Sequence, residues 1–274
     1  MHTPVLLQQA IEKLDIKKDG LYVDATYGEG GYTKEIIKKG GKVLAIDLDI
    51  EQIQKPKFPP KMAGKKNLNL IQGNFAEIEK IAKENNFFPV DGVVFDLGLS
   101  MNQLENSGRG FSYKKLEDDL DMRLDLSQEM TAKELLRKLT VFDLTEILEK
   151  YSEEVNAKKI AKVIKNSQKM EKVKDLVLAI DKALGKKDEK TYARIFQALR
   201  IAINHEFENL EKGLAGVLKI IKKGGRIVVV TFHSLEDRVV KKFVLQNHLK
   251  FVDKKPVFGV KSFERSAKLR TIII

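Results

Sequence analysis

The residues most suited to chemistry are a glycine-rich loop and an acidic residue beyond it. The loop reads DATYGEGG over residues 24–31, between an apolar run and a helical pattern. Glycines there allow the backbone to approach a ligand closely at a helix N-terminus. Asp47 ends the next apolar run, where a carboxylate can accept hydrogen bonds from both hydroxyls of a ribose. The loop lacks G-x-G-x-x-G spacing, which favours S-adenosylmethionine over a nicotinamide dinucleotide; the alternative is a tight turn beside a surface Asp.

A second group of candidates follows the fourth apolar run, which ends at Asp96, and includes Ser100. Ligands of parallel sheets bind at the carboxyl ends of strands, so we expect both side chains at the same crevice as the loop. Methyl transfer from a sulfonium mainly requires alignment of the nucleophile and exclusion of water. Asp96 and Ser100 are therefore candidates to position the methyl acceptor through a hydrogen bond. The alternative for Asp96 is a cap on the next turn.

His233 follows the last long apolar run and precedes a helical pattern. It either orients a base or accepts a proton, or it caps the following helix through local hydrogen bonds. Ser234 begins a typical helix-start sequence, SLED, so we interpret it as a cap rather than a catalyst. No His, Asp and Glu group has clear metal-ligand spacing, and we expect no metal.

The elements that position these residues alternate between strand and helix. Short apolar, β-branched runs predict strands, and helical patterns separate the first of them. This order indicates an α/β fold with a parallel sheet and right-handed crossovers. The predicted strands cover 21–25, 42–48, 69–73, 92–97 and 226–232, and the helices between them include 33–39 and 75–85.

The alternation stops after Leu97. Only helix-period segments follow until about residue 190, namely 132–139, 144–151, 157–166 and 172–184. A long helix from Tyr192 to Lys223 is then expected to lead back to the sheet. We therefore predict one domain from 1–100 and 191–274, with a helical insert over 101–190 that recognises the substrate.

Composition restricts the functional classes. The chain has 274 residues, a net charge of +11 and no cysteine, which excludes a disulfide framework, a thiolate metal site and a cysteine nucleophile. No apolar run approaches the roughly 20 residues that span a bilayer, and no signal peptide opens the sequence. We expect a soluble cytoplasmic protein without a membrane partner.

The positive charge is concentrated near the C-terminus. Residues 238–274 contain ten Lys or Arg and two acidic residues, a net of +8. Such a concentration favours a polyanion partner, with nucleic acid ahead of membrane; the alternative is a general bias toward lysine. Only nine of the 50 basic residues are arginine, so each can mark a site that needs a planar, multi-donor side chain.

Eight motifs in a fixed order resemble one known family. They are HTPVLL at 2–7, GG at 30–31, DLG at 96–98, GRGFS at 108–112, LDMRLD at 120–125, FQALRI at 196–201, FHSLEDR at 232–238 and SAKLR at 266–270. Together they closely resemble the bacterial 16S ribosomal RNA cytosine-N4 methyltransferase family, known as MraW or RsmH. One departure is Tyr32-Thr33, where the family usually has His-Ser.

The resemblance implies a Rossmann-like methyltransferase with a helical insert. It would use S-adenosylmethionine to methylate the 4-amino group of a cytidine in the decoding region of 16S ribosomal RNA, as free RNA or in the small subunit. By motif position, and with Gly28 from the loop, the cofactor contacts are Gly28, Gly30, Gly31, Tyr32, Asp47, Phe75, Asp96 and Gln103. Plain core packing is the alternative for Phe75. The resemblance also raises the chance that the N-terminus, with His2, folds over the cofactor.

The RNA contacts are predicted at Arg109, Arg265, Lys268 and Arg270. The last three precede the apolar run Ile272 to Ile274, which is expected to form an edge strand and so fix their direction. Two other functions remain open from the residues alone. One is a methyltransferase for a small molecule or a protein, and the other is a non-catalytic RNA-binding protein on a decayed methyltransferase fold.

Overall fold

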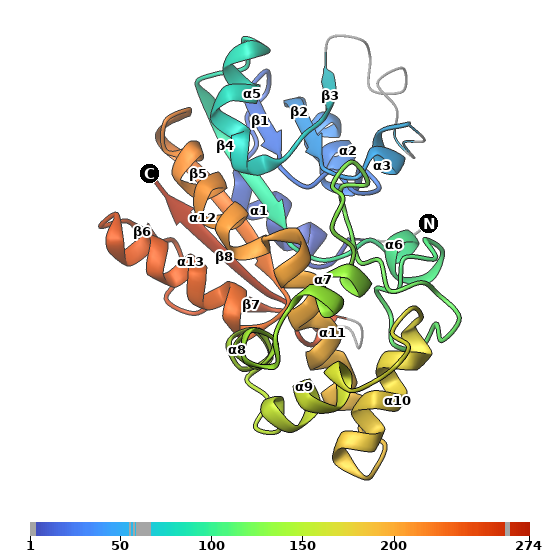
Figure 1. The fold of residues 1–274 in the computed structure, drawn as a ribbon. Helices are drawn as coiled ribbons and strands as arrows, with labels where there is room; N and C mark the ends of the chain where they lie inside the picture. Colours follow the sequence, from blue (N-terminus) through green and yellow to red (C-terminus); the bar gives the residue numbers. More distant parts are fainter. Residues whose placement is uncertain (1–3, 55, 57, 59–66, 261–263) are drawn as a thin grey trace. The chain divides into compact units, whose positions relative to one another are not determined.

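The computed structural model describes residues 4–54, 56, 58, 67–260 and 264–274. The chain divides into two compact units. The first, here called the sheet unit, contains residues up to Gly98 and from Phe207 to Ile274; the second, the helical unit, contains Leu99–Glu206. Each unit is described separately below (Figure 1).

The sheet unit is built on a single sheet with the order β3-β2-β1-β4-β5-β8-β6, in which β7 also pairs with β8. The first five strands are parallel, and β8 is antiparallel to β5. This confirms the predicted α/β class. The strands are β1 (Leu21–Asp24), β2 (Lys42–Asp47), β3 (Leu68–Gln72), β4 (Val90–Asp96), β5 (Ile221–Thr231), β6 (Lys250–Phe251), β7 (Val257–Phe258) and β8 (Lys268–Ile273).

Helices cover both faces of this sheet. Successive strand residues point to opposite faces, so each strand contributes to two buried clusters. Val23 and Val229 belong to a buried cluster with α5, α12 and α13, whereas Tyr22 and Val228 belong to a second cluster with α1 and α2. Burial on both faces explains why the strands are continuously apolar. The helices of this unit are α1 (Leu7–Leu14), α2 (Gly31–Lys38), α3 (Ile50–Gln54), α5 (Ile78–Glu84), α12 (Glu206–Val217) and α13 (Ser234–Gln246), with the 3-10 helix η1 (Phe75–Glu77) before α5.

The strand order reverses between β1 and β4. β1 pairs with β2 on one side and with β4 on the other, and all three run parallel. Ligands of doubly wound sheets bind outside the carboxyl ends of the strands at such a reversal. Asp24, Asp47 and Asp96 are the last residues of these three strands, so the fold brings them to that place.

The predicted edge strand is wrong in one respect. β8 contains most of the run Ile272–Ile274, but it is not at the edge, because β6 and β7 pair with its outer side. These two-residue strands were too short and too polar in sequence to be recognised, since Lys250 and Pro256 interrupt the apolar pattern.

The helical unit consists of α6 (Met101–Glu105), α7 (Ala132–Lys138), α8 (Val141–Ser152), α9 (Ala157–Lys165), α10 (Val173–Leu184) and α11 (Glu189–Asn204). The four predicted helical segments between 132 and 184 are thus confirmed. Residues 99–206 contain no named strand, only one isolated bridge between Asp119 and Lys172. α8 packs on α9 and α11, and α10 packs on α9.

The long helix predicted from Tyr192 to Lys223 is two helices. His205 lies between them in the left-handed region, at φ 50°, which ends α11 before α12 begins. Since α11 packs on α7 and α8, residues 191–206 belong to the helical unit, where the sequence had placed them with the sheet. β5 also begins before Gly224, at Ile221.

Candidate functional site

Main-chain and side-chain hydrogen bonds join the carboxyl ends of β1, β2 and β4. The chain leaving β1 donates from Ala25 to Val94 O at 2.9 Å and from Tyr27 to Ile46 O at 2.8 Å. The Thr26 hydroxyl accepts from the main-chain N–H of Asp96 at 2.7 Å. The loop after β1 is therefore hydrogen-bonded to both neighbouring strands, and these bonds fix the main chain next to the three acidic residues.

Asp47 lies against the glycine loop, as the sequence predicted. Its Oδ2 accepts from the Gly28 N–H at 2.7 Å and its Oδ1 from the Asp49 N–H at 2.9 Å. A carboxylate offers about four acceptor positions, so two remain for hydroxyls of a ligand. Burial raises the pKa of Asp47 to about 7 despite these hydrogen bonds.

Asp24 was not predicted as a site residue, although it opens the quoted loop. It is fully buried, and its Oδ2 accepts from the Thr33 hydroxyl at 2.6 Å and from the Thr33 N–H at 3.1 Å. Burial raises its pKa to about 6. Asp24 thus fixes the start of α2 and adds negative charge to the site; its position as the last residue of a buried strand was the available signal.

Asp96 is half-buried at the end of β4. Its Oδ1 is 3.4 Å from the Gly98 N–H, a long hydrogen bond, and the helix that follows is capped by Ser100 instead, so Asp96 is not a helix cap. Burial raises its pKa to about 7, and the nearby negative charges of Asp24 and Glu236 act in the same direction. The ordinary value for a carboxyl is near 4.

These three carboxyl groups share an electrostatic property. None of Asp24, Asp47 and Asp96 forms an ion pair with another described residue, and burial is the largest cause of each raised pKa. A ligand that brings a positive charge or hydroxyl donors would favour their ionised forms. S-adenosylmethionine carries a sulfonium, an amine and two ribose hydroxyls, so the donor set fits it.

The glycines of the loop have different structural reasons. A Cβ on Gly30 would lie 2.7 Å from the Tyr27 hydroxyl, and one on Gly31 would lie 2.1 Å from Pro4 Cγ. Gly28 has a positive φ of 51°, and a Cβ on it would meet only Thr26 O, at 4.0 Å. Protein packing therefore requires Gly30 and Gly31, and the open side of Gly28 is where a ligand has room.

A family model described as the MraW methylase family matches residues 1–272 of the chain. The chain belongs to this family. It is 41% identical over 251 residues to the ribosomal RNA small subunit methyltransferase H of Halothermothrix orenii, and 42% identical over 251 residues to the protein of that name from Buchnera aphidicola. Both matches cover 88% of this chain and 80% of the relative. A solved ribosomal RNA methylase from Streptococcus thermophilus is 11% identical, with a TM-score of 0.47 over 100% of this chain and 98% of that one.

The structure gives reasons for the two residues that depart from the MraW pattern. Thr33 keeps a hydroxyl for the bond to Asp24, which a serine would also supply. Tyr32 is buried, and its hydroxyl donates to Val5 O. Burial and the charge of nearby Asp96 raise the Tyr32 pKa well above its ordinary value, so Tyr32 stays protonated beside that carboxyl.

Ser100 and Gln103, predicted as a catalytic and a cofactor residue, belong to the helical unit and bond to each other. The Ser100 Oγ accepts from the Gln103 N–H at 3.2 Å, and Gln103 Oε1 accepts from the Ser100 N–H at 2.9 Å. They form the capping box of α6. Their roles toward a ligand remain predictions.

Phe75, predicted beside the adenine, is half-buried in η1. Its ring stands edge-on to Phe95, with centroids 5.5 Å apart, and it packs against Gly213 of α12, where a Cβ would come within 2.8 Å of the ring. Phe75 therefore has a packing role, and its contact with adenine remains a prediction.

His233 caps α13. Its Nδ1 accepts from the Glu236 N–H at 3.3 Å, and Glu236 Oε2 accepts from the main-chain N–H groups of Phe232 and His233. Nε2 lies 2.9 Å from Glu236 Oε1. Both ring nitrogens thus face Glu236, which supports the capping alternative and disfavours a proton-accepting role. The cap is His233 rather than Ser234, and the sequence did not identify Glu236.

The predicted RNA residues differ in availability. Arg109 is only 6% exposed; its guanidinium lies over the Phe111 ring and donates to Arg123 O at 3.0 Å. Arg109 therefore has a packing role, and its contact with RNA remains a prediction. Arg270 is likewise held, because it pairs with buried Asp237 and lies over the Phe251 ring.

Lys268 and Arg265 are more accessible. Lys268 Nζ is 3.9 Å from Asp237 Oδ2, and its side chain is partly exposed. Arg265 is exposed in the turn before β8 and makes no ion pair with a described residue. Of the four predicted cations, Arg265 is therefore the one that can reach a phosphate without losing a partner.

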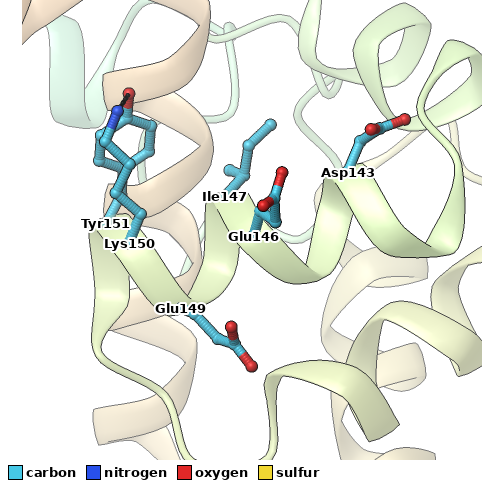
Figure 2. A pocket seen from close by; sticks show the side chains of 6 residues that line it. All are labelled: Asp143, Glu146, Ile147, Glu149, Lys150 and Tyr151. Atoms are coloured by element: carbon cyan, nitrogen blue, oxygen red, sulfur yellow. Dashed lines mark hydrogen bonds between the residues drawn. The ribbon is translucent and has the colours of Figure 1, made fainter.

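One surface hollow lies on α8 in the helical unit (Figure 2). None of the predicted site residues lines it, and three acidic side chains would repel a phosphate backbone. The hollow is lined by Asp143, Glu146, Ile147, Glu149, Lys150 and Tyr151.

Metal-ligand clusters and membrane-spanning helices are both absent within the described ranges. Residues 4–54, 56, 58, 67–260 and 264–274 include no cluster of three His, Cys, Asp or Glu side chains arranged for a metal ion. The same residues include no helix with the length and apolar character needed to cross a bilayer. His2 lies outside the described residues.

Proposed function

We propose that this chain transfers the methyl group of S-adenosylmethionine to the 4-amino group of a cytidine in 16S ribosomal RNA, in the decoding region. Membership of the MraW methylase family supports methyl transfer with this cofactor, and the relatives named as ribosomal RNA small subunit methyltransferases support the RNA substrate. The observation that carries the proposal is that a family match over 1–272 coincides with carboxylates at three adjacent strand ends.

The cofactor site is proposed at the carboxyl ends of β1, β2 and β4. Asp47 would accept the two ribose hydroxyls, because its Oδ2 faces the loop at Gly28 and both oxygens keep free acceptor positions. The open side of Gly28 would receive the adenosine. Asp96 and Asp24 would balance the positive charge of the methionine part. When bound, S-adenosylmethionine supplies an activated methyl group.

Asp96 is proposed as the acceptor for the target amine. The lone pair of a cytosine 4-amino group is delocalised into the ring, so attack is favoured when a base takes hydrogen bonds, and then a proton, from the nitrogen. As the N–C bond forms, the C–S bond breaks and its electron pair stays on sulfur. A carboxyl with a pKa of about 7 is suited to accept the released proton at neutral pH.

Asp96 is held for this role by its neighbours. The Thr26 hydroxyl accepts from the main-chain N–H of Asp96 at 2.7 Å. The side chains of Tyr32 and Glu236 lie near its carboxyl group. Since Glu236 is committed to the cap of α13, its charge stays close to Asp96 and keeps that pKa high. His233 would then act by ordering the start of α13, as a positioning residue.

The experiment is methyl incorporation with tritiated S-adenosylmethionine, using free 16S RNA and assembled small subunits, followed by mass spectrometry of the nucleosides. We expect N4-methylcytidine and the loss of that product with Asp96→Asn. Label in another nucleoside, or in protein with the RNA unlabelled, would contradict the proposal. We place the activity in the cytoplasm, where such subunits are assembled.

A further inference from the structure

The outer edge of the sheet has an unusual local structure. β6 and β7 both pair with β8, but Phe251 is opposite Ile272 and Val257 is opposite Leu269. Two residues of β8 thus face the five residues 252–256; Val252 still donates to Thr271 O at 2.8 Å, and the chain leaves the edge after it. This segment and β7 are called the edge loop below (residues 252–258).

The edge loop presents cations without partners. Its acidic residue, Asp253, has a side chain that is 37% exposed and pairs with Lys13 of α1 at 2.6 Å. Lys254 and Lys255 are exposed and form no ion pair or hydrogen bond with any described residue. Arg265, also exposed, is in the turn that leads into β8. This differs from Arg270, whose charge is already compensated by Asp237.

An aromatic side chain is exposed beside these cations. Phe258 is 53% exposed, and its cross-strand partner is Lys268. Residues opposite each other in antiparallel strands point to the same face, so a partly exposed lysine flanks the phenyl ring. Exposed aromatic rings among cations are the arrangement with which proteins hold single-stranded nucleic acid, the ring by stacking on a base and the cations by contacting phosphates.

The register places this ring at the functional end of the sheet. Asp96 is opposite Val230, Val230 is opposite Leu269, and Leu269 is opposite Val257. Val257 is therefore level with Asp96 and three strands away, about 14 Å at the usual strand spacing. Phe258 and Asp96 are at the same end of one sheet, within a single compact unit.

We propose that the edge loop and the turn before β8 form an RNA-docking edge, where Phe258 stacks on a base near the target and Lys254, Lys255 and Arg265 contact phosphates. This inference rests on the proposed function for its ligand class. A target cytidine must leave its stack to be modified, so neighbouring unstacked bases are available to an aromatic side chain.

Edge protection and peptide binding are the alternatives to RNA docking at this edge. Exposed lysines and a bulged strand can simply protect a sheet edge against aggregation. A sheet edge can also bind a peptide strand, but β7 has only two residues, and Pro256 precedes it, so it offers few hydrogen bonds for such pairing.

The first test uses fluorescence. The chain contains no tryptophan, so Phe258→Trp gives a single reporter in the full-length protein. We expect strong quenching when a short single-stranded RNA containing cytidines is added, because the indole would stack on a base. Phe88→Trp is the matched control, since Phe88 is 44% exposed just before β4, at the opposite end of the same sheet from Asp96. Unchanged Phe258→Trp fluorescence at saturating RNA would overturn the proposal.

The second test separates stacking from charge. Phe258→Ala should weaken binding of the same RNA by about 5- to 150-fold, without changing the salt dependence. Lys254→Ala/Lys255→Ala should reduce the slope of log K against log salt by about 0.7 for each lost contact. The control is Lys17→Ala/Lys18→Ala, an exposed lysine pair before β1, at the opposite end of the sheet.

The outcomes distinguish this proposal from the proposed function. RNA binding and quenching that depend on the edge loop, with no methylated cytidine formed, would retain the docking edge and reject the activity. Normal methylation and RNA affinity in both edge variants would reject the docking edge and retain the activity. Increased aggregation with unchanged RNA affinity would identify edge protection as the role of the lysines, which also overturns the proposal.

Discussion

The carboxyl ends of β1, β2 and β4 and the outer edge beyond β8 are charged in opposite ways and built in opposite ways. At the strand ends, acidic groups are buried or half-buried and accept hydrogen bonds from nearby main-chain N–H groups, as Asp47 does from Gly28. At the edge, some basic side chains are paired with an acidic residue that is distant in the sequence, as Arg270 is with Asp237, and others are not. The first region has the character that we propose for binding one small cationic ligand, and the second has the character that we propose for binding a large polyanion.

The largest expected effect tests whether Arg270 is structural. Arg270→Ala should lower the free energy of unfolding by about 3–5 kcal/mol, because it leaves the buried Asp237 carboxylate without its main partner. Urea denaturation measures this loss. The control, Arg265→Ala, should leave stability unchanged, since Arg265 is exposed and unpaired among the described residues. Equal stability of the two variants would contradict a structural role for the Arg270–Asp237 ion pair.

The next effect is on catalysis. Asp96→Asn should reduce methyl transfer by about 10²–10³-fold, the usual consequence of losing one electrostatic partner of a reaction, because the amide cannot accept the proton. The variant should fold normally, since burial disfavours the charged carboxylate. Single-turnover methylation together with a thermal melt would measure both properties. Near-normal turnover would make Asp96 a structural residue.

A smaller effect is expected on cofactor affinity. Asp47→Ala should weaken S-adenosylmethionine by about 1.5–3 kcal/mol, the range for hydrogen bonds to a charged group. Asp91→Ala is a matched control, because Asp91 also accepts a main-chain N–H, from Leu21 at 2.9 Å, and lies near the start of β4 rather than its end. Calorimetry should find that the control binds like wild type. An unchanged dissociation constant for Asp47→Ala would remove Asp47 from the site.

The smallest effect is the pH dependence of stability. The pKa values of Asp47 and Asp96 are about 7 in the folded protein, above the value near 4 of an unfolded carboxyl. The folded state therefore binds more protons between these values, and the stability from these groups is complete below about pH 4 and is lost as pH rises through about 7. Urea midpoints at pH 5 and 7.5 should differ less in Asp96→Asn than in wild type; an identical difference would contradict the raised pKa.

The same two regions show how far the sequence could be interpreted. Strand ends follow from local pattern, so Asp47 and Asp96 were located from apolar runs that end in an acid, and the parallel order placed them together. The cofactor role of the glycines stays a prediction, and the packing reason for Gly31 could not be found from the sequence, because Pro4, which approaches it, is 27 positions away in the chain.

The edge could not be predicted in this way. Arg265 and Arg270 look alike in sequence, and only the return of α13 beside β8 gives Arg270 its partner. β6 and β7 are two residues long, too short for any periodicity. The boundary near residue 206 was missed for a related reason, because the helical pattern of α11 continues into α12 and the sequence did not indicate the positive φ of His205.

The most direct test of the central claim, that uncompensated carboxylates at the strand ends form the site of a cationic cofactor, is proton release on binding. Calorimetric titrations at pH 7, in buffers of different ionisation enthalpy, would compare S-adenosylmethionine with S-adenosylhomocysteine, which lacks the sulfonium charge. Wild type should release more protons with S-adenosylmethionine, because the positive charge favours ionised Asp96, and Asp96→Asn should abolish the difference. Equal proton release with the two ligands in wild type would contradict the account.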